Sequence, residues 1–126
     1  MSILQKLYKL QLIGRIPEYV PTNSVYEVVM GSVAYGANLD TTRKSDTDIY
    51  SIYLPLKEQL FPNLSGKVWG FDEFPETKTY QFVGLKVEDE EFDISCYPIT
   101  KFFHLAEQNN PNVIDALFVD FDCVRK

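Results

Sequence analysis

Three aspartates are the side chains whose types and spacing most clearly suggest chemistry. Asp46 and Asp48 lie two residues apart in segment 46–54 (DTDIYSIYL), whose alternation predicts a β-strand. Both side chains then leave the same face of that strand, with Cα atoms roughly 7 Å apart. Asp93 lies in a second predicted strand, 91–97. If the two strands are neighbours, three carboxylates form a cluster whose repulsion is relieved by divalent cations, and oxygen ligands favour Mg²⁺ or Mn²⁺.

A glycine-serine pair complements these acids. Gly31 and Ser32 directly follow segment 24–30 (SVYEVVM), whose apolar and β-branched residues predict a buried strand. Because glycine lets a phosphate approach the backbone, and a serine hydroxyl and amide groups can hold it, the pair predicts a phosphate site. A phosphate site beside carboxylates that bracket two metal ions, about 4 Å apart, has the parts that nucleotidyl transfer needs.

The elements that must position these residues mix helices and strands. Apolar spacing predicts a helix over residues 2–13, and prolines at 17 and 21 follow it. Two further strands are predicted over 78–86 and 91–97, joined by an acidic turn at 87–90. Helices are predicted over 98–108, with Phe102 and Phe103 on its apolar side, and over 112–119. Residues 56–77 show no organised pattern. The order predicts an α/β or α+β domain, with a mixed β-sheet flanked by helices.

Charge and composition narrow the function classes. The chain has 126 residues and a net charge of −6, which fits one acidic domain. Segment 72–93 holds eight acidic side chains and two lysines. The chain lacks the basic surface of a protein that holds long nucleic acid by charge, although a nucleic-acid end could still bind through metal ions. Two cysteines and the absence of a long apolar run predict a cytoplasmic protein without a membrane partner.

The motifs in their order resemble a known superfamily. GSVAYG at 31–36, SDTD at 45–48 and EFDI at 91–94 are similar to the pattern of the DNA polymerase β nucleotidyltransferase superfamily. DISCY at 93–97, KFF at 101–103 and NPNVID at 110–115 strengthen the resemblance to its predicted bacterial and phage nucleotidyltransferases. The match runs from about residue 25 to 120, which is most of the chain.

The resemblance implies a fold, a reaction and a role for each site residue. The fold is a mixed sheet flanked by helices, and residues 1–126 are a nucleotidyltransferase catalytic domain that lacks the group's usual helical C-terminal part. Asp46 and Asp48 bind two Mg²⁺ or Mn²⁺ ions, and Asp93 helps to hold the catalytic metal and to activate the acceptor hydroxyl. Gly31 and Ser32 hold the triphosphate of an NTP. The hydroxyl attacks the α-phosphate in line, and pyrophosphate leaves.

The acceptor and two rival functions stay open. An RNA 3′ end, a protein side chain and a small molecule each offer a suitable hydroxyl. One rival is a degenerate nucleotidyltransferase fold that acts as a binding or regulatory module, which the presence of all three acids disfavours. The other is an antitoxin-type nucleotidyltransferase that modifies a partner toxin, which a neighbouring toxin gene would favour.

Several other residues attract attention, and the sequence gives none of them a catalytic role. His104 is expected to be structural, and Lys101 to be a solvated helix residue. Cys96 alternates with the face of the third aspartate and is expected in the core. Arg43 and Lys44 could reach a phosphate, but no role follows from the sequence. The GxxxxG at 31–36 lacks the lysine of a phosphate-binding P-loop, and the DxD lacks the remaining ligands of an EF-hand.

Overall fold

The computed structural model describes residues 2–31, 47–68, 70–73, 77–87 and 90–126. In chain order, its elements are α1 (Ile3–Lys9), α2 (Tyr19–Thr22), β1 (Ser24–Met30), β2 (Thr47–Tyr53), α3 (Lys57–Leu60), the 3-10 helix η1 (Pro62–Ser65), β3 (Tyr80–Val87), β4 (Glu90–Pro98), α4 (Ile99–Glu107), α5 (Pro111–Leu117) and the 3-10 helix η2 (Phe121–Cys123). The four predicted strands are confirmed, with β1 at the predicted bounds and the bounds of the other three within two residues.

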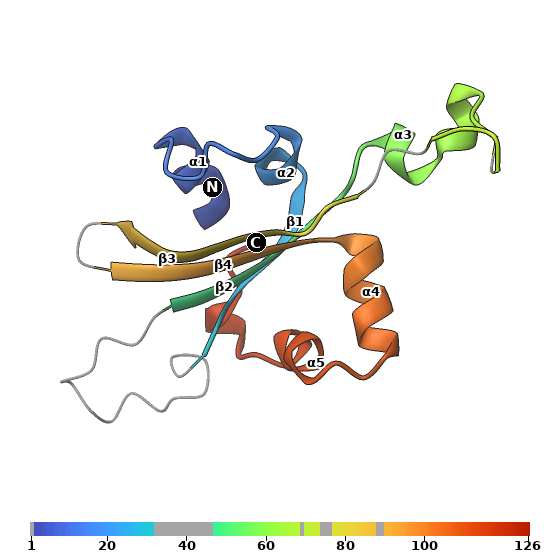
Figure 1. Cartoon of the computed structure of the whole chain (residues 1–126). Helices are drawn as coiled ribbons and strands as arrows, with labels where there is room; N and C mark the ends of the chain where they lie inside the picture. Colours follow the sequence, from blue (N-terminus) through green and yellow to red (C-terminus); the bar gives the residue numbers. More distant parts are fainter. Residues whose placement is uncertain (1, 32–46, 69, 74–76, 88–89) are drawn as a thin grey trace.

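The strands form one mixed sheet in the order β1-β2-β4-β3. The central pair, β2 and β4, is parallel, and both outer pairs are antiparallel. In the parallel pair Asp48 lies opposite Asp93, and Ile49 lies opposite Ile94. Helices α1 and α2 cover one face of the sheet, and α4 and α5 cover the other (Figure 1). The predicted architecture, a mixed sheet flanked by helices, is confirmed.

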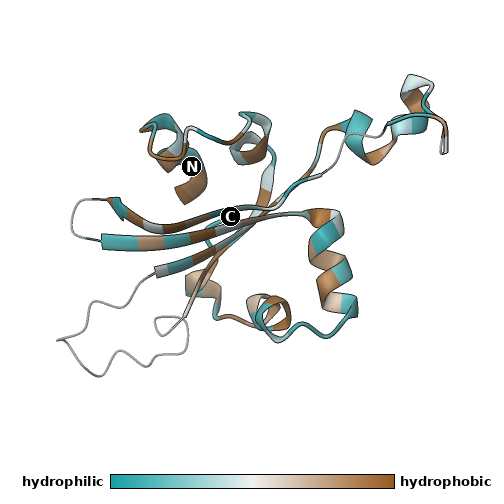
Figure 2. Cartoon of the chain, viewed as in Figure 1, coloured by the Kyte–Doolittle hydropathy of each residue, from teal (hydrophilic) through white to brown (hydrophobic). Residues whose placement is uncertain are grey.

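Two apolar layers hold the helices on the sheet. The first lies under α1 and α2, and its buried members include Leu4, Leu7, Val20, Ile49, Tyr53, Ile94 and Cys96. The second lies over α4 and α5, and its buried members are Val28, Met30, Ile52, Phe102, Val113 and Ala116. Figure 2 shows hydrophobic residues along the middle of the strands and hydrophilic residues where β2 and β4 begin. The core therefore fixes the sheet and leaves that end of it polar.

A buried glutamate on β1 anchors the start of α1. The Glu27 side chain is fully buried, and its carboxylate accepts hydrogen bonds from the amides of Ile3 at 2.6 Å and Leu4 at 3.1 Å. The next amide, that of Gln5, donates to the hydroxyl of Ser2 at 3.1 Å. The first three amides of α1, which have no partner within a helix, are therefore all satisfied.

The first helix is shorter than the sequence predicts. It ends at Lys9 instead of residue 13 because Gln11 adopts a left-handed backbone conformation, with φ of 59°. Ile13 and Ile16 are nevertheless buried, at 1% and 5% exposure, since the turns after the helix fold back onto the same layer. Pro21 lies inside the short helix α2. The apolar spacing predicts burial correctly for Leu4 and Leu7, whereas Leu10 is 56% exposed, and the prediction of a continuous helix is wrong.

Helix α4 corrects a second expectation. Phe102 is buried against the sheet, whereas Phe103 is 62% exposed, so the prediction that both lie on the apolar side is wrong for Phe103. Successive residues of an α-helix point about 100° apart, so two adjacent large side chains cannot both face the sheet squarely. The rings still touch edge to face, with centroids 5.9 Å apart.

The last residues of the chain lie along β1. Val124 forms an isolated antiparallel bridge with Val28. The Arg125 amide donates to the Glu27 carbonyl at 2.7 Å, and the Glu27 amide donates to the Lys126 carbonyl at 3.1 Å. Because β1 is an outer strand of the sheet, these bonds satisfy backbone groups on its otherwise open side.

The segment between β2 and β3 projects beyond the sheet. It carries α3 and η1, which the sequence pattern does not reveal, and it leaves from the carboxyl end of β2 (Figure 1). Within the described part of the chain, no helix is both long enough and apolar enough to cross a membrane.

Candidate active site

Three chain segments bring predicted site residues to one end of the sheet. Strands β2 and β4 are parallel, so both begin at that end, and β1 runs antiparallel to β2 and finishes there. Asp48 is the second residue of β2 and pairs in register with Asp93 on β4. On the other side Asp48 pairs with Met30, the last residue of β1, and Gly31 follows directly. The two aspartate strands are therefore neighbours, which is the condition that a carboxylate cluster requires.

The backbone of Gly31 lies close against Asp48. A Cβ atom added at Gly31 would stand 3.2 Å from Asp48 Oδ2, which is tighter than ordinary van der Waals contact. Gly31 also has φ of +88°, a left-handed conformation that glycine adopts without steric cost. Glycine is therefore favoured here for two reasons: the left-handed turn of the chain after β1, and the closeness of the carboxylate.

The carboxylate of Asp93 has a specific backbone partner. Its Oδ1 atom accepts a hydrogen bond of 2.7 Å from the amide of Gly84 on the outer strand β3. Asp48 and Asp93 are both partly buried. Further along the same face, Tyr50 and Tyr97 pack edge to face with ring centroids 5.7 Å apart.

The donor set suits a hard divalent cation. Asp48 and Asp93 offer carboxylate oxygens from adjacent positions of neighbouring strands, and Mg²⁺ prefers such ligands. The third predicted ligand, Asp46, lies outside the described residues, as do Ser32, Arg43 and Lys44. Among the residues that are described, no group of three or more His, Cys, Asp or Glu side chains could hold a metal ion. The described pair would thus need a further ligand, from Asp46 or from a substrate.

The structure does not bring Lys101 and His104 to these carboxylates. Both are exposed residues of α4, which begins after Pro98 at the opposite end of β4. His104 Nδ1 lies 4.0 Å from Glu107 Oε2 on the same helix. The structural role expected of His104 stays a prediction.

Cys96 is a core residue, as predicted. Its side chain is fully buried on the sheet face opposite Asp93. Burial, and then the negative charge of Glu27, raise the pKa of the Cys96 thiol to about 12. A thiol with this pKa stays protonated near neutral pH, so Cys96 is no nucleophile for this site.

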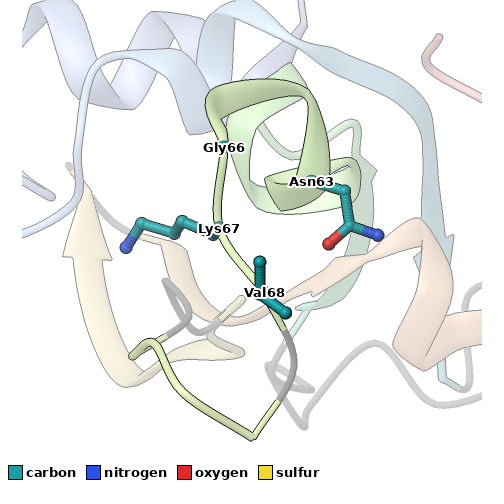
Figure 3. A pocket seen from close by; sticks show the side chains of 4 residues that line it. All are labelled: Asn63, Gly66, Lys67 and Val68. Carbon is teal, nitrogen blue, oxygen red and sulfur yellow. The ribbon is translucent and has the colours of Figure 1, made fainter.

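A pocket of about 400 Å³ lies on the projecting segment and is distinct from the aspartates. It is lined by Asn63, Gly66, Lys67 and Val68, and the Asn63 and Lys67 side chains extend in different directions around it (Figure 3). Lys67 Nζ donates to the Glu73 carbonyl at 2.5 Å. The segment leaves the carboxyl end of β2, whereas Asp48 lies near its amino end, so this pocket is not part of the same site.

Sequence reasoning missed Gly84. Its signal was present, because a glycine inside a strand pattern often marks a bulge or a close backbone approach. Only the structure shows that this glycine faces Asp93.

Comparison with protein families gives an independent result. The family model RlaP, described as the RNA repair pathway DNA polymerase beta family, matches residues 9–126. Comparison with curated proteins gave no match, and comparison with solved structures gave none. The matched region contains every strand of the sheet and all the predicted site residues. The chain therefore belongs to the RNA repair pathway DNA polymerase beta family, a family of polymerase β-type nucleotidyltransferases.

Proposed function

We propose that the chain is a Mg²⁺- or Mn²⁺-dependent enzyme that transfers a nucleoside monophosphate from an NTP to a hydroxyl group. The observation that carries the proposal is the register of the parallel pair, which sets Asp48 beside Asp93 with Gly31 against Asp48. A carboxylate pair beside a glycine turn supplies metal ligands next to a place where a phosphate can meet the backbone. Family membership supports the same reaction class.

The proposed reaction gives each site residue a role. Asp46 and Asp48 would hold two metal ions, with Asp93 on the catalytic one, while Gly31 and Ser32 would hold the triphosphate. When bound, the ions would neutralise phosphate charge and favour ionisation of the acceptor hydroxyl. The acceptor oxygen forms a bond to the α-phosphorus as the bond from that phosphorus to the bridging oxygen breaks. Pyrophosphate leaves, and the hydroxyl proton passes toward Asp93 or solvent.

The proposed acceptor is the 3′-hydroxyl of an RNA end. The family description, which names an RNA repair pathway, supports this choice over a protein or a small molecule. The net charge of −6 fits contact with a short RNA end better than with a long RNA, because extended contact requires many cationic side chains. The metal ions would supply much of the positive charge at such an end.

The first test measures NTP binding by calorimetry, with and without Mg²⁺, for the wild type and for Asp46→Asn/Asp48→Asn. Binding should require Mg²⁺ and be lost in the double variant. A matched control is Asp120→Asn/Asp122→Asn, which removes the same charge at the same spacing from the N-cap and the middle of η2 and should bind normally. Equal binding by all three proteins would refute the site.

A second test follows label from α-³²P NTPs into RNA that ends in a 3′-hydroxyl or a 3′-phosphate. The proposal expects label only on the hydroxyl end, with release of pyrophosphate. Metal-dependent binding without transfer to RNA, protein or small-molecule hydroxyls would instead favour the binding-module alternative.

A further inference from the structure

Strand β3 carries a β-bulge opposite Asp93. Phe82 pairs with Ile94, and Leu85 pairs with Phe92, so Val83 and Gly84 together face the single residue Asp93. Two residues opposing one is the defining feature of a bulge, and bulges often redirect groups beside active sites. Gly84 has φ of +66°, which lets its amide leave the regular ladder at this point.

The bulge directs that amide to the carboxylate. Gly84 N donates to Asp93 Oδ1 at 2.7 Å, a short hydrogen bond for an amide donor. A Cβ atom at Gly84 would stand 3.3 Å from Glu91 Oε1, so the position also lies close to a second acidic side chain. The backbone of β3 therefore supplies the one positive dipole that contacts Asp93 within the described residues.

We propose that Gly84 is a positioning residue that orients Asp93 for metal binding. The inference rests on the proposed function, since it assigns Asp93 to the metal. With Oδ1 held by the amide, the Asp93 side chain stays in one rotamer, and Oδ2 points in a single direction as a metal ligand. Hydrogen-bond partners of metal ligands usually change metal affinity about 10- to 100-fold when they are removed. The bulge thus links the shape of an outer strand to the strength of the metal site.

The hydrogen bond can be tested in the metal-free protein by NMR. In the wild type the Gly84 amide proton should resonate downfield and exchange slowly with solvent, although Gly84 itself is exposed. In Asp93→Ala the resonance should move upfield and exchange should accelerate. An unchanged Gly84 amide in Asp93→Ala would overturn the inference without involving nucleotide or catalysis.

The effect on metal binding can be tested with three glycine variants and Mn²⁺ alone, measured by electron paramagnetic resonance. Gly84→Val cannot keep the left-handed conformation easily, so it should flatten the bulge and weaken Mn²⁺ binding about 10- to 100-fold. Gly84→Asn tolerates that conformation and should restore most of the affinity. Gly66→Val is the matched control, because Gly66 has φ of +83° and nothing lies within 4 Å of its added Cβ. It should lower the urea midpoint while leaving Mn²⁺ binding unchanged.

The outcomes separate the inference from the proposed function. Normal Mn²⁺ binding by folded Gly84→Val would refute the positioning role and leave the proposed function intact. Absence of Mn²⁺ binding by the wild type would refute the metal site and with it this role. If Gly84→Val does not fold, Gly84→Asn and the NMR comparison decide the question.

Discussion

Replacing Glu27 by alanine should destabilise the protein strongly although Glu27 lies outside the site. The carboxylate is fully buried and accepts hydrogen bonds from the Ile3 and Leu4 amides. Hydrogen bonds to charged groups contribute about 1.5–3 kcal/mol each, so the loss of both amounts to about 3–6 kcal/mol. Domains of this size are stable by only about 5–15 kcal/mol, so the variant should lose a large part of its stability.

The assay is urea unfolding at 25 °C, followed by circular dichroism. Glu27→Gln keeps one acceptor oxygen and should lose roughly half as much free energy of unfolding as Glu27→Ala. Glu18→Ala is the matched control, because Glu18 is exposed and its side chain makes no capping bond to α2, so its change should stay within about 0.5 kcal/mol. A loss below about 1 kcal/mol in Glu27→Ala would refute the reasoning, since buried amides would then tolerate the absence of a partner.

Two further predictions concern Gly31 and Cys96. Gly31→Ala should cost about 1–2 kcal/mol through its φ of +88°, and it should also weaken Mg²⁺-dependent NTP binding, because the new Cβ crowds Asp48 Oδ2. Calorimetry and urea unfolding compare this variant with Gly70→Ala, which has a similar strain at φ of +86° and no atom within 4 Å of the added Cβ. Equal NTP affinity in the two variants would contradict the prediction. The Cys96 thiol has a pKa raised from 9.0 to about 12, so the stability it confers is present below pH 9 and is lost between pH 9 and pH 12. Stability measured by urea unfolding should fall by about 1.4 kcal/mol per pH unit more in the wild type than in Cys96→Ala over that range, and parallel curves would show that the thiol does not contribute.

Much of the sheet could be predicted because alternation in a strand has a strict period of two. That period placed Asp48 on one face of its strand and Ile49 on the other, and it did the same for Asp93 and Ile94. The parallel register then pairs carboxylate with carboxylate and isoleucine with isoleucine. The pairing itself was not predictable from spacing, because the partners lie far apart in the chain and either direction of pairing keeps the faces intact.

Other features depended on local conformations that residue types do not fix. Gln11 ends α1 early by adopting φ of 59°, which a glutamine rarely does. The sequence around Glu27, a glutamate inside the apolar β1 pattern, does not reveal its hydrogen-bond partners, since they are amides of a helix more than twenty residues earlier. Gly84 carried a readable signal, but its meaning required knowing which residue stands opposite on β4.

The bonds between β1 and residues 124–126 also bear on self-association. An uncovered outer strand exposes a row of unpaired amides and carbonyls that a second molecule can extend into a continuous sheet. Here Val124 bridges to Val28, and the Glu27 backbone is satisfied by Arg125 and Lys126. This short stretch therefore blocks one route to aggregation. Detaching it would expose the unpaired backbone edge of β1, the strand that leads into Gly31.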